Sequence, residues 1–250
     1  MMIDGLVSVV MPAYNAAKTI EKSIETVLKQ TYQSWELIIV EDCSKDQTLQ
    51  LLEQYKDNPK IKVIANKANS GAAVTRNNAL EAAQGQYVAF LDSDDLWEPE
   101  KLEKQIAFLT EKKVGFSFTS YSCIDENGTD MGREIHVPPT VSDKQLLGNT
   151  IIGCSTVLID RSIIQDFRFV VNNKREDTFA WYLILKSGFI AYGMDEMLMK
   201  YRVASSSSSS NKYKMAKEYY RGLKEIAKLN LFQRVWYFGS YAFHALKKRA

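Results

Sequence analysis

The sequence has few of the residues from which disulfide frameworks, zinc sites and histidine-based active sites are built. Its three cysteines, Cys43, Cys123 and Cys154, are odd in number and far apart. They form no closely spaced metal-binding pair and fit a reducing cytosol better than a disulfide framework. The only histidines are His136 and His244. We expect neither to be catalytic, although His136 could help to bind an acceptor or a metal.

Long apolar runs are also missing. The longest uncharged stretch near the C-terminus, residues 235–246, has 12 residues, whereas a helix that spans a bilayer needs about 20. The N-terminus has no basic segment, and Asp4 precedes the first apolar run. The sequence therefore predicts neither a signal peptide nor a membrane-spanning helix, and we find no internal repeats.

Net charge is low, at +2 over 250 residues, so composition offers no argument for nucleic-acid binding. The charge is unevenly placed, however. Residues 221–250 hold seven basic side chains and one acidic side chain, a net charge of +6, which leaves −4 for the first 220 residues. An acidic body with a basic tail points to an anionic surface as the partner of the tail.

The first part of the chain alternates apolar runs with stretches of helical periodicity. Four apolar runs predict buried strands: 6–11, 36–40, 61–65 and 87–91. Between them we expect a helix at 18–30, a helix opened by a capping box of Ser44 and Gln47, and a helix at 72–83 that Gly85 ends. This alternation predicts an α/β fold in which parallel strands are joined by right-handed crossovers, with helices on both faces.

Beyond residue 95 the pattern is less regular. We expect helices at 99–112 and from Glu176 to Gly188, and strands at 114–124, 151–159, 189–192 and 197–201. Residues 129–149 have no clear period and predict a partly irregular excursion. Six consecutive serines, 205–210, mark a linker or mobile loop before two helical stretches at about 212–229 and 231–248.

Three carboxylates, Asp92, Asp94 and Asp95, follow the fourth predicted strand. Ligands bind at the carboxyl ends of the strands in an open α/β sheet. Neighbouring carboxylates repel one another unless a cation or hydrogen bonds offset the repulsion, and Mg²⁺ or Mn²⁺ is suited to that position. The alternative is that these acids are solvated or cap the next helix. The loops after strands one and two would bring Tyr14 and Asp42 to the same rim.

Five short segments, taken in order, resemble the family-2 glycosyltransferases, which mostly act on bacterial surface polysaccharides. They are residues 7–15, 40–46, 69–71 with Arg76 and Asn77, 92–95, and 176–177. One departure is Cys43, where the family more often has glycine. The likeness covers about residues 6–203 and implies the GT-A fold, a Rossmann-like and mainly parallel central sheet with helices on both faces.

The resemblance also implies a division of the chain. Residues 1–204 would form the catalytic domain, with a nucleotide-binding half at about 1–95 and an acceptor-binding half at 96–204. The serine-rich loop at 205–211 would follow. Beyond the likeness, the sequence itself predicts that residues 212–250, the C-terminal extension, are helical, amphipathic and basic.

The implied activity is metal-dependent transfer of a sugar, with inversion, from a nucleoside-diphosphate donor to a hydroxyl of a glycan or lipid-linked acceptor. We expect uridine as the nucleoside, because Asp42 resembles the carboxylate that accepts from the uracil N–H. The implied nucleotide-sugar contacts are Pro12, Ala13, Tyr14, Asp42, Arg76, Asp92, Ser93 and Asp94. The implied direct ligand of Mn²⁺ or Mg²⁺ is Asp95, with Asp94 beside it.

The remaining roles fall in the second half. Asp177 stands where the family places the general base, and Glu176 is the fallback. Trp181 could stack on an acceptor sugar or could belong to the core.

Several alternatives stay open. The chain could be a non-catalytic, membrane-associated module that binds a nucleotide sugar. A sugar-nucleotide pyrophosphorylase is a poorer match, because that class would need a glycine-rich loop where Pro12 to Asn15 stand. Residues 221–249 combine aromatic and basic side chains, which suits peripheral docking on the cytoplasmic face of an anionic inner membrane. They could equally pack on the catalytic domain or on a second subunit. The sequence predicts no oligomeric state.

Overall fold

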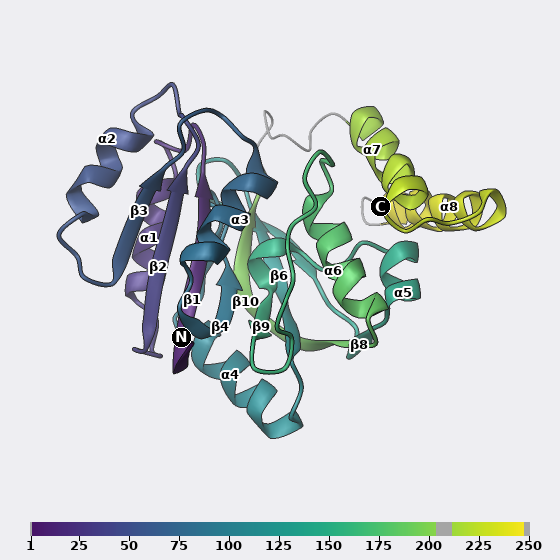
Figure 1. Ribbon diagram of the computed structural model, residues 1–250, viewed down its shortest axis with the longest axis horizontal. Coiled ribbons are helices and arrows are strands. Elements are labelled where there is room, and N and C mark those ends of the chain that lie inside the picture. Colours follow the sequence, from purple (N-terminus) through teal and green to yellow (C-terminus); the bar gives the residue numbers. More distant parts are fainter. Residues whose placement is uncertain (1, 204–211, 248–250) are drawn as a thin grey trace.

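The computed structural model describes residues 2–203 and 212–247, so the predicted serine-rich loop lies outside the described residues. Within these ranges, ten strands form one sheet, with helices in front of it and behind it (Figure 1). The strands are β1 Ile3–Ala13, β2 Trp35–Glu41, β3 Ile61–Ala65, β4 Gly85–Phe90, β5 Leu96–Trp97, β6 Phe116–Ile124, β7 Asp130–Ile135, β8 Thr140–Val141, β9 Leu158–Asp160 and β10 Ala191–Arg202. The helices are α1 Ile20–Leu28, α2 Thr48–Leu52, α3 Ala72–Ala82, α4 Lys101–Lys112, α5 Asp143–Gly148, α6 Glu176–Lys186, α7 Lys212–Glu225 and α8 Leu231–Lys247, with 3₁₀ turns η1 Glu53–Tyr55 and η2 Cys154–Thr156.

The strand order is β3-β2-β1-β4-β9-β6-β10-β5, with β7 beside β6 and β8 beside β10. The first four strands in this order are parallel, as the alternation of strands and helices predicts. Strand β9 is antiparallel to both β4 and β6, whereas β10 is parallel to β6. The sheet is therefore mixed, with its parallel half formed by β1 to β4, and the predicted α/β class is confirmed.

The sheet buries a hydrophobic core on each face. In β1, Val7, Val9 and Met11 pack in one core, which also contains residues of α1 and α4. Val10 lies in the other core, with residues of α3, α5 and α6. Successive side chains of a strand point to opposite faces, so a continuous apolar run is required where helices cover both.

Two predicted helix boundaries are wrong. Helix α2 begins at Thr48, and its N-cap residue Gln47 makes no capping hydrogen bond through its side chain. The Ser44 hydroxyl instead accepts from the Asn15 N–H at 2.9 Å. Gly85 does not end α3; it is the first residue of β4. A Cβ at Gly85 would lie 2.5 Å from the Leu6 carbonyl oxygen, so this glycine permits close approach of two strands.

The second half also differs from its prediction. Residues 129–149 contain β7, β8 and α5, and α5 has a capping box of Ser142 and Gln145. The predicted strand at 151–159 is reduced to η2 and the short β9, and the two strands expected at 189–201 are one strand, β10, with irregular register. None of the helices in the described ranges has the length and hydrophobicity needed to cross a membrane.

The C-terminal helices α7 and α8 pack against α5 and α6 (Figure 1). Tyr219 is fully buried; its ring stacks on Phe179 and its hydroxyl donates to the Leu147 carbonyl. The Ser240 hydroxyl donates to the Gly148 carbonyl at 3.0 Å. Of the alternatives for the extension, packing on the rest of the same chain is thus present in the structure.

Candidate active site

The carboxyl ends of β1, β2 and β4 lie at one edge of the sheet, at the top of Figure 1. Pro12 and Ala13 end β1 and are paired with β2, and Tyr14 follows them with 45% of its surface exposed. Asp42 follows β2, and the acidic loop, Asp92 to Asp95, follows β4. The predicted donor-side residues thus come from neighbouring strand ends of one sheet edge.

Asp42 fastens the loop that leads into α3. Its side chain is buried, and its carboxylate accepts from the Asn66 amide and from the backbone N–H groups of Ser70 and Gly71, each at 2.8 Å. Three of about four acceptor positions of the carboxylate are thus used within the protein. A contact with a nucleobase would add to these bonds, so the predicted role of Asp42 remains a prediction.

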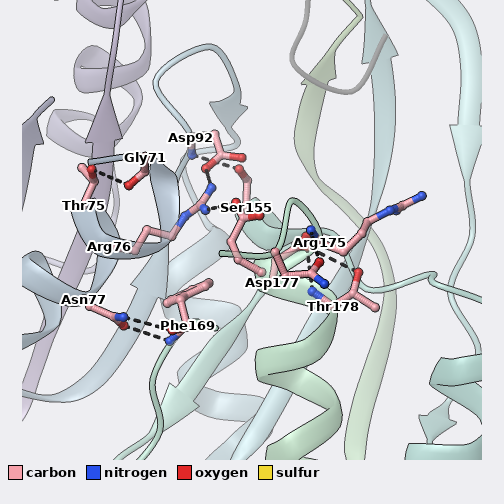
Figure 2. A network of polar contacts seen from close by, with 12 residues as sticks. Gly71, Thr75, Arg76, Asn77, Asp92, Ser155, Phe169, Arg175, Asp177 and Thr178 are labelled. Atoms are coloured by element: carbon pink, nitrogen blue, oxygen red, sulfur yellow. Dashed lines mark hydrogen bonds and ion pairs between the residues drawn. The ribbon is translucent and has the colours of Figure 1, made fainter. Parts of the chain in front are cut away.

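Arg76 joins the two halves of the candidate site (Figure 2). It projects from α3, is 5% exposed, and pairs with Asp92 Oδ1 at 2.5 Å and with Glu176 Oε1 at 2.9 Å. Burial opposes the charge on Arg76, but the carboxylates, Asp92 first, keep its pKa well above the ordinary value. The predicted nucleotide contact is therefore engaged in an ion-pair bridge between the acidic loop and α6.

Asp95 is held entirely by the protein. It is 2% exposed, its Oδ2 accepts from the Ser155 hydroxyl at 2.6 Å, and its Oδ1 accepts from the Arg202 N–H at 3.0 Å. Burial and then the charges of Asp94 and Asp92 raise its pKa well above the ordinary value. The Ser155 hydroxyl also accepts from the Asp92 N–H at 3.0 Å. These contacts fix the shape of the acidic loop.

Asp94 is less buried than Asp95 and stands close to the charge of Asp92. Burial, and next the negative charge of Asp92, raises the pKa of Asp94 to about 6. A divalent cation would relieve that repulsion. The described residues contain no group of three or more aspartate, glutamate, histidine or cysteine side chains that together could hold a metal ion. Mg²⁺ commonly uses one or two carboxylates plus substrate phosphates, so Asp92 and Asp94 fit an ion shared with a diphosphate.

Glu176 and Asp177 open α6, with different surroundings. Glu176 makes the ion pair with Arg76; burial raises its pKa, Arg76 opposes that rise, and Asp177 adds to it. Asp177 is partly exposed, and its Oδ1 accepts from the Thr178 N–H at 2.6 Å. In Figure 2, Ser155 lies between Arg76 on one side and Asp177 on the other. Glu176 is thus committed to an ion pair with Arg76, whereas Asp177 is partly exposed and forms no ion pair within the described part of the chain.

Trp181 belongs to the core. It is fully buried, and its ring centroid lies 5.3 to 5.5 Å from those of Phe90, Phe116 and Phe169. It offers no face to an acceptor sugar, so the acceptor-binding assignment is corrected to the core alternative. His136 pairs with Asp195 at 2.7 Å and His244 packs edge-on against Phe243. Neither contact involves the acidic loop or α6.

Two residues of the site were missed from the sequence. Ser155 accepts from the Asp92 backbone and donates to Asp95, and Arg202 donates through its backbone to Asp95 and through Nε to the Asp94 carbonyl at 2.8 Å. The contacts to the acidic loop use the Ser155 hydroxyl, the Arg202 backbone N–H and the Arg202 guanidinium, and their partners lie far along the chain. No motif marks them, whereas the carboxylates they hold stand in a recognisable cluster.

A comparison with protein-family models matches residues 8–168 to "Glycosyl transferase family 2". A Bacillus subtilis protein provisionally named as the teichuronic acid biosynthesis glycosyltransferase TuaG is 48% identical over 98% of this chain and 97% of its own length. The Escherichia coli UDP-Glc:alpha-D-GlcNAc-diphosphoundecaprenol beta-1,3-glucosyltransferase WfgD is 40% identical over 100% of this chain and 97% of its own length.

Among solved structures, Staphylococcus aureus TarS in complex with UDP-GlcNAc matches with a TM-score of 0.71 over 97% of this chain and 73% of that chain, at 22% identity. A mannosyltransferase from Pyrobaculum calidifontis, solved with GDP-Man and Mn²⁺, matches with a TM-score of 0.71 over 96% of this chain and 73% of that chain, at 18% identity. At these identities the likeness shows a shared fold.

Proposed function

Because the chain belongs to glycosyl transferase family 2, with the GT-A fold, we propose that it moves a sugar from a UDP donor to a hydroxyl of a lipid-linked glycan, with inversion. In this proposal residues 1–95 bind the donor and residues 96–204 bind the acceptor. The observation that carries it is the Asp92–Arg76–Glu176 bridge, which sets the acidic loop beside the start of α6.

We assign the direct metal contact to Asp94, supported by Asp92, in place of Asp95. Both oxygens of Asp95 already accept hydrogen bonds from Ser155 and Arg202, so Asp95 is better suited to holding the acidic loop. A bound Mg²⁺ or Mn²⁺ would act as a Lewis acid on the leaving diphosphate. Tyr14, exposed on the rim, would cover the nucleobase, with Asp42 as the acceptor for its N–H.

The chemistry is a single displacement at the anomeric carbon. The acceptor oxygen forms a bond to that carbon as the bond to the diphosphate oxygen breaks, and the electron pair leaves with UDP. Asp177 takes the proton of the acceptor hydroxyl. A general base in this position typically raises the rate of the reaction by about 10²–10⁴-fold. Attack from the face opposite the leaving group inverts the anomeric centre, so an α-linked UDP-sugar yields a β-linked product.

The choice of donor and acceptor is supported by WfgD, whose name states its reaction and which is 40% identical over the whole chain. We propose UDP-glucose as the first donor to test and a sugar on diphosphoundecaprenol as the acceptor. The product would enter cell-surface polysaccharide synthesis. The pyrophosphorylase alternative finds no support in the comparisons, and a module that binds without transfer is an outcome of the experiment below.

The test compares Asp177→Asn, Asp94→Asn and the parent in UDP-glucose binding and in sugar transfer, each with Mn²⁺. Asp177→Asn should bind donor like the parent and lose transfer by at least about a hundredfold. Asp94→Asn should lose the Mn²⁺-dependent part of donor binding. Asp166→Asn is the matched control, because Asp166 is an exposed acid outside the site. If both variants transfer as well as the parent, the role assignments fail, and a parent that binds but never transfers supports the binding-module alternative.

We also propose peripheral attachment to the cytoplasmic face of an anionic membrane. The outward face of α8 carries Phe232, Trp236 and Phe243, which are 87%, 75% and 65% exposed. Exposed Lys224 and Lys228 lie at and beyond the end of α7. Aromatic side chains beside lysines suit an anionic headgroup layer.

Vesicle flotation tests this attachment. The parent should float with vesicles that contain anionic lipid, and Trp236→Ser should reduce the floating fraction. Leu49→Ser, at an exposed apolar residue on α2, is the control. Equal flotation of parent and Trp236→Ser would count against the attachment.

A further inference from the structure

The C-terminal helices contact the segment that leads into the proposed general base. We propose that α7 and α8 position Asp177, with Tyr241 and Glu218 as the positioning residues. This inference rests on the proposed function, because it takes Asp177 as the base. It assigns the extension a part in transfer itself, separate from membrane attachment.

Helix α7 holds the base segment, defined here as Asn172 to Arg175, which ends where α6 begins. The Glu218 carbonyl accepts from the Asn173 amide at 3.2 Å, and the Glu218 carboxylate accepts from the Lys174 N–H at 3.4 Å. That carboxylate is kept in place by Arg221 at 2.6 Å, and Arg221 in turn donates to the Asn172 carbonyl. The base segment is thus bonded to α7 at three successive residues.

Helix α8 holds the last residue of the base segment. The Arg175 guanidinium donates to the Tyr241 hydroxyl and lies 5.1 Å from the centre of the Tyr241 ring. The Tyr241 ring packs on Tyr219, 4.3 Å between centroids, and Tyr219 stacks on Phe179 of α6. Tyr241 therefore contacts Arg175, at the start of α6, directly, and it contacts Phe179, within α6, through Tyr219.

Asp177 lies between two sets of anchors. Glu176 is tied to Arg76 on the donor side, and Arg175 is tied to Tyr241 on the side of the extension. A shift of about 1 Å in a reacting group can cost a hundredfold in rate. The contacts of Asp42 and Asp92 involve neither α7 nor α8. Loosening the anchors on α7 and α8 should therefore slow transfer and leave donor binding intact.

The test uses the full chain and two variants of α8. Tyr241→Phe removes only the hydroxyl that Arg175 contacts and keeps the ring. Ser240→Ala, the matched control, removes a docking bond of the same helix, to the Gly148 carbonyl, that does not touch the base segment. For each we measure kcat for transfer, Kd for UDP-glucose with Mn²⁺, and the melting temperature. Glu218→Ala repeats the test from α7.

We expect Tyr241→Phe and Glu218→Ala each to lower kcat by roughly tenfold or more with Kd for donor unchanged. Ser240→Ala should lower the melting temperature by about as much as Tyr241→Phe does, since each loses one hydrogen bond of α8, but it should keep the kcat of the parent. Equal kcat in Tyr241→Phe, Ser240→Ala and the parent would overturn the inference, as would equal losses in both variants.

Asp177→Asn, run alongside, separates the two proposals. If it keeps full transfer, the base assignment fails and this inference fails with it. If Asp177→Asn loses transfer while Tyr241→Phe and Glu218→Ala do not, the proposed function stands and only the positioning role is wrong.

Discussion

Replacing Arg76 by methionine removes the cation that joins Asp92 and Glu176 while keeping a long side chain. The three side chains are 6%, 30% and 15% exposed, so the Glu176 carboxylate would be left buried without its partner. Breaking a buried pair in this way costs about 3–5 kcal/mol. Since domains of this kind have about 5–15 kcal/mol of total stability, the variant should fold but unfold at markedly lower urea.

The loss should depend on pH, and its sign follows from Glu176. Burial already raises the pKa of Glu176, and Arg76 opposes that rise. Without Arg76 the folded-state pKa rises further above the unfolded value, so the folded variant binds more protons than the unfolded chain. Its stability then falls as pH rises through that window. Urea unfolding at about pH 5 and about pH 8 should show the larger loss at the higher pH.

A double variant isolates the cause. Arg76→Met with Glu176→Gln should recover part of the lost stability, because the unpaired carboxylate is gone. Arg168→Met, at an exposed arginine, is the control and should change little. An equal loss at both pH values, with no recovery in the double variant, would refute the reasoning.

Three further predictions concern single positions. Cys43 has a φ of +57°, a left-handed conformation that costs a residue with a Cβ roughly 1–2 kcal/mol. Cys43→Gly should therefore raise the urea concentration at the unfolding midpoint, and a lower midpoint would contradict this. Burial lowers the pKa of Lys101 from 10.5 to about 7. Between these pH values the unfolded chain binds a proton that the folded chain does not, so the stability of the parent should rise with pH there. Lys101→Met should flatten this pH dependence, and an unchanged slope would exclude the lysine as its source. Removing divalent metal with EDTA should weaken UDP-glucose binding by the parent but not by Asp94→Asn, measured by titration calorimetry, and an equal response in both would argue against Asp94 as the ligand.

The strands of the parallel half could be predicted because their signal is local. Strands β1, β2 and β4 are largely buried on both faces, so their apolar runs are nearly continuous in the sequence. Strand β3 lies at the edge of the sheet and is only partly buried, with Lys62 exposed, but Ile61, Val63 and Ile64 still mark it as a strand. The second half could not be predicted in this way. Strand β9 has three residues, and β10 is interrupted by shifts in register. Helix α5 does carry a local signal, the capping box of Ser142 and Gln145. This signal is easily overlooked because the surrounding residues show no helical periodicity of apolar side chains.

The candidate site likewise has residues that could be predicted from the sequence and residues that could not. The carboxylates of the acidic loop and of α6 stand in short motifs, so their positions could be predicted. The partners of Arg76, in contrast, lie 16 and 100 residues along the chain, and no local pattern reveals such contacts. The sequence left open whether Trp181 binds acceptor or packs in the core, since a helical residue beside apolar neighbours fits either; burial decides for the core.

The most direct test of the central claim is a single-turnover measurement of sugar transfer by Asp177→Asn and by the parent, at donor and acceptor concentrations that saturate both. We expect the parent and the variant to be saturated at the same donor concentration, and the variant to form glycosidic product at least about a hundredfold more slowly. Product formation at the parent's rate would show that the acceptor's proton goes elsewhere, and the role assigned to the start of α6 would be wrong.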